Sequence, residues 1–289
     1  MIKHKRILVP VKLAAIPDYA FDRALELARH SGSELYLLHA VPLHQPYGFR
    51  AELRARRFRD LRERALLAGV AVQIVEQQGD AADVIVLHAD SRPVDLVVMA
   101  SERRTGWERI RKPSITESVM RRTIRPTLVV RPDETGGYRN VLVGTDLSSE
   151  SAHVISSVVG MPGVDVRNLT VVHAVEQIES ADAIRSPGRW KVAEYRGFVL
   201  DDARRELAVM MQGVETTAKV NLRVSGGAAD EVIESHAADV DPDLIVVGRT
   251  RRLLQFASTA RRLLRTTDRS LLVVPPAVVN SRSIYKRVA

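Results

Sequence analysis

The chain alternates short apolar runs with longer stretches in which apolar and polar positions follow a helical period. In the first half, the apolar runs predict strands at 6–12, 34–41, 71–76, 94–100 and 126–131. The stretches between them predict helices at 18–31, 50–68, 80–90 and 114–124; in the first of these, Ala24 and Leu27 fall on one side, and Arg23 and Glu26 on the other. Because the runs are continuous in Val, Ile and Leu, both faces of each strand should be buried. The alternation predicts parallel βαβ units with right-handed crossovers.

The same pattern occurs twice along the chain. RILVPVKL at 6–13 is echoed by NVLVGTDL at 140–147, LYLLHAV at 35–41 by LTVVHAV at 169–175, and RPTLVVRP by RSLLVVPP. Strands of the second copy are predicted at 139–145, 168–174, 217–224, 242–248 and 269–274. The sequence therefore predicts an α/β protein with two tandem doubly wound, Rossmann-like domains, each a five-stranded parallel sheet flanked by helices. Pro and Gly residues between 131 and 140 indicate a short linker.

Composition narrows the possible functions. The chain has 289 residues, a net charge of +8 and no Cys, which excludes disulfides, thiolate catalysis and Cys-based metal sites. No early apolar stretch has the length of a membrane span, and MIKHKRILVPV is too short for a signal peptide, so we expect a cytoplasmic protein. The basic balance favours phosphates, acidic partners and nucleic acid only in a general way.

A ligand of such a sheet binds beyond the carboxyl ends of the strands, where the strand order reverses. In each copy this point lies between the first and fourth strands. The residues there are VKLAA (11–15) and MASERR (99–104) in the first copy, and TDLSS (145–149) and VGRTRR (247–252) in the second. Helices that begin beyond these strand ends offer unpaired backbone N–H groups to phosphate.

These elements together resemble the universal stress protein (UspA) family, and the whole of 4–276 resembles its tandem members. The resemblance rests on the strand end VGTDLSSES, on HAV closing the second strand of both copies, and on IRPTLVV after a Ser-led helix. It implies the adenine nucleotide alpha hydrolase-like fold and two domains that pack partly through their last strands. We expect one domain at 1–132, a second at 138–276 and a C-terminal tail at 277–289.

ATP-binding members of the family carry Gly-x2-Gly-x9-Gly-Ser/Thr after the fourth strand. Glycine lets the backbone approach phosphate, and the terminal Ser caps the helix. In the first copy the pattern falls on Ala100, Arg103, Pro113 and Ser114, so all three glycines are replaced. The Asp expected at the first strand end is Lys12, which removes an acceptor and adds a cation. The first site is therefore predicted to be degenerate.

The second copy keeps more of the motif, in a loop that is four residues shorter. The second glycine is replaced by Arg251, and the last pair is Ala257-Ser258, with Ser258 expected to cap the last helix. The candidate contacts to ATP or AMP here are Asp146, Ser148, Val175, Gly248, Arg251, Ser258 and Thr259. The arginines of this loop are either phosphate ligands or a solvated surface.

Other chemistry is not indicated. His39 and His173 occupy equivalent strand ends and are interpreted as packed, hydrogen-bonded residues, because no ligand spacing surrounds them. His88 and His236 are expected at a helix surface or helix end. We predict no metal site and no catalytic residues, since no nucleophile elbow, phosphate loop or H-E-x-x-H motif is present. Weak nucleotide hydrolysis stays open.

Two helical segments stand out by composition. RAELRARRFRDLRERALLAG, 50–69, is strongly basic, but its interleaved acidic residues indicate ordinary surface ion pairs rather than specific nucleic-acid binding. The equivalent segment of the second copy, 188–213, carries Trp190, Tyr195 and Phe198. These aromatic residues are expected to pack against the partner domain or a second chain, with a ligand pocket as the less favoured alternative.

The resemblance implies a non-catalytic stress-response protein that regulates or protects by binding partners or ligands. One alternative is an ATP or AMP switch that uses the second domain. Another is a basic protein associated with nucleic acid, driven by the charge of +8. The domains should form an intramolecular pair, and a further homodimer is open.

Overall fold

The computed structural model describes residues 6–12, 18–46, 48, 50–101, 113–132, 136–161, 163–175, 189–249 and 256–277. Strands of the first domain are β1 (Arg6–Pro10), β2 (Glu34–Val41), β3 (Val72–Gln78), β4 (Leu96–Ala100) and β5 (Thr127–Val130). Its helices are α1 (Tyr19–Ser31), α2 (Ala51–Leu67), α3 (Ala81–Ser91) and α5 (Ile115–Arg122). These elements confirm the predicted strands and helices, with ends shifted by no more than two residues.

The second domain repeats the arrangement. Its strands are β6 (Asn140–Thr145), β7 (Asn168–Val175), β8 (Lys219–Gly226), β9 (Leu244–Gly248) and β10 (Ser270–Val274). Its helices are α6 (Ser151–Val159), α8 (Arg189–Gln212), α9 (Ala229–Val240) and α10 (Phe256–Thr266). The expectation that Ser258 caps α10 is wrong, because the helix begins at Phe256. Its counterpart α5 begins only after Pro113, whereas Ala257 at the aligned position favours helix.

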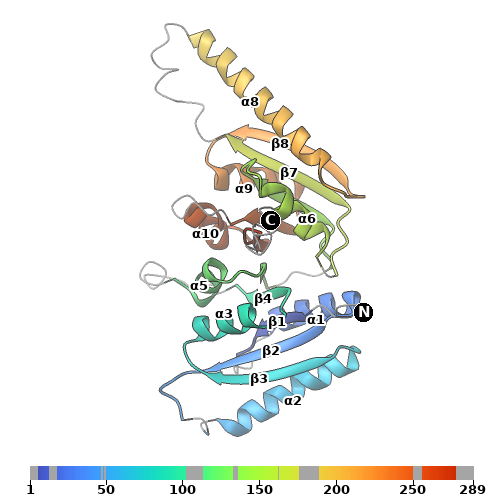
Figure 1. Cartoon of the computed structure of the whole chain (residues 1–289), viewed down its shortest axis with the longest axis vertical. Helices are drawn as coiled ribbons and strands as arrows, with labels where there is room; N and C mark the ends of the chain where they lie inside the picture. Colours follow the sequence, from blue (N-terminus) through green and yellow to red (C-terminus); the bar gives the residue numbers. More distant parts are fainter. Residues whose placement is uncertain are drawn as a thin grey trace, which may run out of the picture.

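The two domains share one continuous sheet (Figure 1). The strand order is β3-β2-β1-β4-β5-β10-β9-β6-β7-β8. All neighbours are parallel except β5 and β10, which pair antiparallel through Leu128 and Leu272 at the centre of the sheet. The fold prediction is confirmed, and the last strand of each domain joins it to the other. β3 and β8 are left as the two edges.

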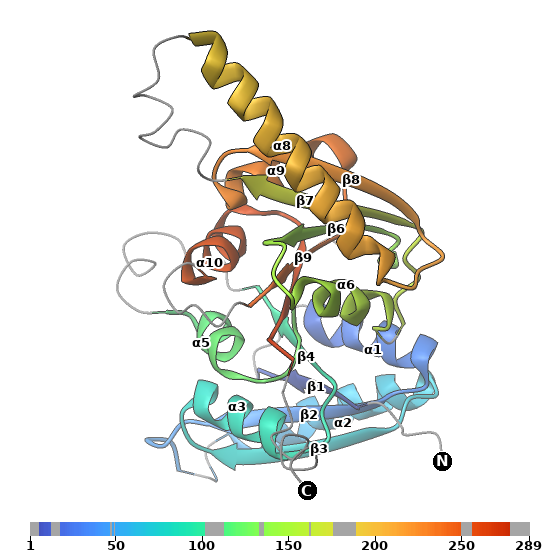
Figure 2. The ribbon, with the colours of Figure 1, turned by 45° about the horizontal axis from the view of Figure 1, so that its top comes forward.

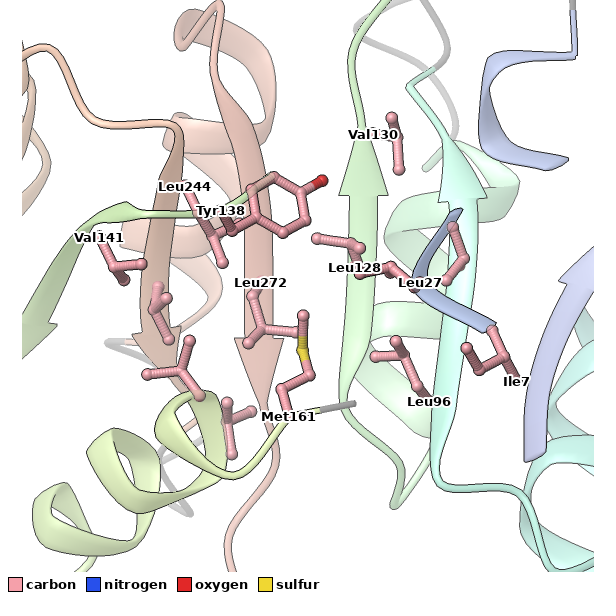
Figure 3. Close-up of a cluster of buried hydrophobic side chains, with 14 of the residues drawn as sticks. Ile7, Leu27, Leu96, Leu128, Val130, Tyr138, Val141, Met161, Leu244 and Leu272 are labelled. Atoms are coloured by element: carbon pink, nitrogen blue, oxygen red, sulfur yellow. The ribbon is translucent and has the colours of Figure 1, made fainter. Parts of the chain in front are cut away.

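One face of this sheet carries a core that crosses the domain boundary. Helices α1, α2, α6 and α8 cover it, and its buried side chains belong to a single hydrophobic cluster. Figure 3 shows Leu27 and Leu128 of the first domain beside Tyr138, Met161 and Leu272. The boundary is therefore packed like the interior of one domain.

On the other face, α5 and α10 lie side by side across the boundary (Figure 2). Glu117 of α5 pairs with Arg261 and Arg265 of α10 at 2.8 and 3.5 Å. Two further arginines cross the boundary in opposite directions. Arg131 donates to the carbonyl of Leu264, and Arg249 donates to the carbonyl of Met120. Cations placed on carbonyls near a helix C-terminus also complement the helix dipole.

The linker is held by a residue that the helical period assigned to solvent. Arg23 on α1 is buried, donates to the carbonyl of Gly136 and lies with its guanidinium carbon 4.8 Å from the ring centroid of Tyr138. The polar side of α1 faces the linker at this turn. The buried guanidinium is tolerated because it also donates to the carboxylate of Glu26 at 2.8 Å, so that a carbonyl, a carboxylate and an aromatic ring all interact with it.

Candidate functional site

The two points at which the strand order reverses lie where the sequence predicted them. In the first domain β1 has β2 on one side and β4 on the other, and in the second β6 has β7 and β9. Each domain thus has its topological switch point between its first and fourth strands. In the second domain Gly144 pairs with Val247, which brings Asp146 and Gly248 to neighbouring positions on the carboxyl edge.

Asp146 is ordered by the turn that it begins. Its Oδ1 accepts hydrogen bonds from the backbone N–H of Ser148 and from the hydroxyl of Ser151, both at 3.0 Å. Leu147, between Asp146 and Ser148, has a φ of 56°, a left-handed backbone conformation that is uncommon for residues other than glycine. The turn presents an exposed carboxylate directly after β6.

The charge of Asp146 is favoured by this geometry. Partial burial raises the pKa of the carboxyl, but the hydrogen bonds from Ser148 and Ser151 outweigh it and the pKa is lowered overall. Asp146 is therefore an anion at neutral pH. An exposed anion suits hydroxyl or amino donors of a ligand and disfavours a phosphate group in contact with it.

Gly248, the remaining glycine of the phosphate motif, has a packing reason of its own. A Cβ built on it would lie 2.8 Å from Cγ2 of Val154 on α6. A Cβ on Gly144 would likewise lie 2.5 Å from Cδ1 of Ile233 on α9. Both glycines allow a helix to approach the sheet closely. The glycine at 248 is thus explained without a phosphate.

The other predicted contacts of the second domain spread along the same edge. Val175 ends β7, next to β6, and is half-buried against the common core. Thr259 lies in the first turn of α10 and is half-buried. Ser258 precedes it in that turn, and Arg251 lies outside the described residues. The structure brings Asp146, Ser148 and Gly248 together on two neighbouring strand ends.

In the first domain the corresponding groups are engaged by the chain itself. Ser101, after β4, receives a hydrogen bond on its hydroxyl from Arg131 and one on its carbonyl from the Tyr19 hydroxyl. The carbonyl of Ala100 accepts from Thr116. Sequence reasoning missed these contacts. Only the change from Arg131 to the aligned Pro275 hinted that the two strand ends differ.

The remaining first-domain motif positions differ in what they retain. Lys12 is exposed beyond β1, where Asp146 stands in the second domain. Ser114 is the N-cap of α5 and accepts from the backbone N–H of Glu117 at 3.0 Å, as expected for the motif's last position. Arg103 lies outside the described residues.

The histidines at the strand ends have the structural role predicted for them. Nδ1 of His39 lies 3.0 Å from the carbonyl of Val11, and Nδ1 of His173 lies 2.9 Å from that of Thr145. Both contacts tie the second strand of a domain to the end of its first strand. A histidine used in this way holds the crevice in shape.

The expectation for His88 is confirmed in part, because the residue lies in the last turn of α3 but not at its surface. Its side chain is buried, with Nδ1 2.8 Å from the Tyr36 hydroxyl and Nε2 bonded to the Gln77 amide oxygen. Burial, with a smaller contribution from Arg92, lowers the pKa of His88. The equivalent His236 is 2.9 Å from the Ser225 hydroxyl. Both histidines lie on the apolar side of their helix, and each one satisfies a polar group beneath it.

The basic helix α2 uses its arginines on its own domain. Arg54 pairs with Glu76 of β3 at 2.9 Å, and Arg57 pairs with Asp18, the N-cap of α1, at 3.0 Å. These pairs reach other elements, and Arg57 also pairs with Asp60 at 3.1 Å within the helix, as the sequence suggested. Arg54 and Arg57 are therefore engaged by the fold, while Arg56, Arg59 and Arg62 are exposed on the outer side of the helix.

Two classes of site are absent from the described part of the chain. Across the residues that the structure describes, no three His, Asp or Glu side chains are grouped so that they could hold a metal ion. None of the described helices combines the length and hydropathy needed to cross a membrane.

Comparison with known proteins agrees with this architecture. The sequence profile described as the universal stress protein family matches the chain twice, at residues 3–131 and 137–275. A universal stress protein of Methanocaldococcus jannaschii is 27% identical over 140 residues, covering 44% of this chain and 82% of that protein. The protein YxiE of Bacillus subtilis, also a universal stress protein, is 26% identical over 145 residues, covering 44% of this chain and 98% of its own length.

The whole two-domain arrangement also has solved counterparts. A universal stress protein structure from Archaeoglobus fulgidus superposes with a TM-score of 0.67 at 15% identity, covering 94% of this chain and 96% of that one. A structure from Pseudomonas aeruginosa gives 0.66 at 17% identity, with 94% of both chains covered. At such identities the likeness is one of fold.

Proposed function

The chain belongs to the universal stress protein family, with two tandem domains, and on that premise we propose that it acts by binding rather than by turnover. In this proposal the second domain binds an adenine nucleotide, ATP or AMP, at the crevice between β6 and β9. The first domain serves as a fixed scaffold. The result is a regulatory or protective protein whose state reports the nucleotide.

The observation that carries the proposal is the difference between the two crevices. At the first, Lys12 replaces the acceptor, and Ser101 is occupied by Arg131 and Tyr19. At the second, Asp146 offers an ionised and exposed carboxylate beside Gly248. Ribose hydroxyls and the adenine amino group are donors that such a carboxylate accepts.

The proposed roles follow from the residues at that edge. Asp146 would bind the nucleoside, and Ser148 would hold the carboxylate in place through its backbone N–H. Val175 and Thr259 would line the sides of the crevice. Gly248, which has no side chain, lets α6 approach the end of β9 closely. Arg251 and Ser258, four-residue deletion notwithstanding, are the candidates for contact with phosphate.

Calorimetric titration of the nucleotide-stripped protein with ATP and AMP tests the proposal. We expect saturable binding near one site per chain. The Asp146→Asn variant keeps an oxygen for the turn but loses the charge, so its affinity should fall about tenfold or more. Lys12→Ala, at the matched position of the first domain, should leave binding unchanged.

Two results would reject the nucleotide site. Absence of heat at millimolar nucleotide would leave both crevices as relics, and binding retained in Asp146→Asn but lost in Lys12→Ala would place the site in the first domain. Phosphate release measured with bound ATP tests the non-catalytic part separately, and we expect none above the background of the buffer.

A further inference from the structure

The outer face of α8 is a helical surface whose side chains are exposed among the described residues. Buried or half-buried side chains at Leu200, Ala203, Leu207 and Met210 dock the helix against β7 and β8. On the opposite side, Tyr195, Phe198 and Val209 are 48%, 64% and 65% exposed. Figure 2 shows α8 lying across the second domain, with its N-terminal end beyond the edge of the sheet. The expectation that Tyr195 and Phe198 pack on the partner domain is therefore wrong.

The exposed side of α8 has a regular spacing. Its outer stripe consists of Tyr195, Phe198, Asp202, Arg205, Val209 and Gln212, all of them exposed. The steps along it alternate between three and four residues, which is the spacing of a coiled-coil seam. A stripe of this kind on the solvent side of a docked helix indicates a helical partner.

We propose that α8 pairs antiparallel with α8 of a second copy of this chain through this outer stripe. A two-fold axis crossing the helix between residues 203 and 204 places Phe198 opposite Val209 of the other copy. The same axis places Asp202 opposite Arg205 and Tyr195 opposite Gln212. The stripe is thus complementary to itself in size and charge, as a symmetric interface requires.

Charge selects this occupant and this direction. Asp202 and Arg205 are paired within one helix at 3.1 Å and keep side-chain exposures of 54% and 66%. In the antiparallel dimer, two such pairs form a ring of alternating charge. Parallel pairing would set Asp202 against Asp202 and Arg205 against Arg205, which disfavours it.

The equivalent helix of the first domain lacks these features. The outer side of α2 carries Glu52, Arg56, Arg59 and Glu63, all exposed, and its exposed apolar side chains are leucines near the helix ends instead of aromatic residues. Two copies of α2 would bring arginines together. The proposed contact therefore depends on the side chains of α8 and not on the fold that the two domains share.

The size of the contact predicts a weak dimer. α8 spans 24 residues, or about 36 Å, and a single helix pair lies at the low end of specific interfaces. Sedimentation velocity from about 1 to about 100 µM should therefore show a concentration-dependent monomer–dimer equilibrium. Phe198→Glu should raise the dissociation constant about tenfold or more, because it buries a charge opposite Val209. Leu67→Glu on α2, where the side chain is 83% exposed, is the matched control and should change nothing.

Introduced thiols test the direction of pairing, since the chain has no Cys of its own. A Phe198→Cys preparation mixed with a Val209→Cys preparation should form a disulfide-linked dimer under mild oxidation. Neither preparation alone should do so, because two copies of position 198 would lie roughly 16 Å apart along the helix pair, beyond the reach of a disulfide.

Charge reversal gives a second test that leaves the fold intact. Asp202→Arg and Arg205→Asp each oppose like charges in a self-dimer and should each remain monomeric, while their mixture should associate. A wild-type chain that stays monomeric across the range overturns the proposal. So does a dimer unaffected by Phe198→Glu, or a disulfide that forms as readily in a single preparation as in the mixture.

Discussion

The helices α2 and α8 occupy the same place in the two domains but are held there by different forces. α2 lies against its domain through Leu61 and Ala65 and through arginines that reach Asp18, Asp22 and Glu76. α8 is docked by Ala203 and Leu207, while its arginines pair only with Asp201 and Asp202 one turn earlier, among the contacts seen in the described residues. The edge strand beneath it, β8, is also the more exposed of the two edges.

The same contrast holds at the switch points. In the first domain, side chains of the chain itself occupy the strand ends, and in the second they leave a carboxylate exposed. A duplicated fold can thus keep its frame while one copy turns its polar groups inward. The second domain, which leaves these polar groups exposed, is the one that has surface available for ligands and partners.

The largest effect is expected from the side chains that dock each helix. Leu61→Ala and Leu207→Ala remove fully buried side chains and should each lower the free energy of unfolding by about 3 kcal/mol. Phe198→Ala should lower it by less than about 0.5 kcal/mol, because this side chain is exposed. Chemical denaturation measures all three. A cost for Phe198→Ala equal to that of Leu207→Ala would show that the outer face of α8 packs within the chain.

An intermediate effect is expected from the arginines. Arg54→Ala leaves Glu76 without its buried partner and should cost about 2 kcal/mol, reduced from the value for a fully buried pair by the partial exposure of Glu76. Arg204→Ala on α8 should cost less than about 0.5 kcal/mol, because its pair with Asp201 is exposed. Equal costs would contradict the view that only α2 is fastened by its charges.

The smallest effect concerns pH and the carboxyls near the first helix of each domain. The pKa of Asp146 is lowered from the usual 3.8, so its stabilising contribution is present above 3.8 and is lost as pH falls through the folded-state pKa. The free energy of unfolding of Asp146→Asn should therefore be lower than that of wild type at neutral pH, by less than about 1 kcal/mol, and the difference should vanish in acid.

Asp18 should behave in the opposite sense. Burial raises its pKa above 3.8 despite hydrogen bonds from Phe21 and Arg57. The folded state then holds the proton more tightly than the unfolded state, and stability from this group falls as pH rises through that range. Thermal unfolding of Asp146→Asn and Asp18→Asn across acidic pH compares the two signs directly, and shifts of the same sign would contradict the assignment.

Much of the fold was predictable because its signals are local. Continuous apolar runs, helical periods and the repeat of whole segments located each strand, and each helix of the first domain, within two residues. The positions of Lys12 and Asp146 at equivalent strand ends followed from the same alignment. The roles of buried polar residues were not predictable in this way. Arg23 lies on a position that a simple amphipathic pattern assigns to solvent, and His88 was expected at a helix surface or a helix end, yet both are buried.

The sequence by itself determined the order of elements, the duplication and the loss of the first-domain motif, since each depends on residues near one another in the chain. Only the tertiary structure decided which polar side chains are engaged in hydrogen bonds and ion pairs with distant parts of the chain. Arg131 meets Ser101 and Leu264, and Glu117 meets Arg261, across separations that no local period reports. The contacts of Arg131 with Leu264 and of Glu117 with Arg261 depend on the antiparallel pairing of β5 with β10, which brings the two copies of one pattern together.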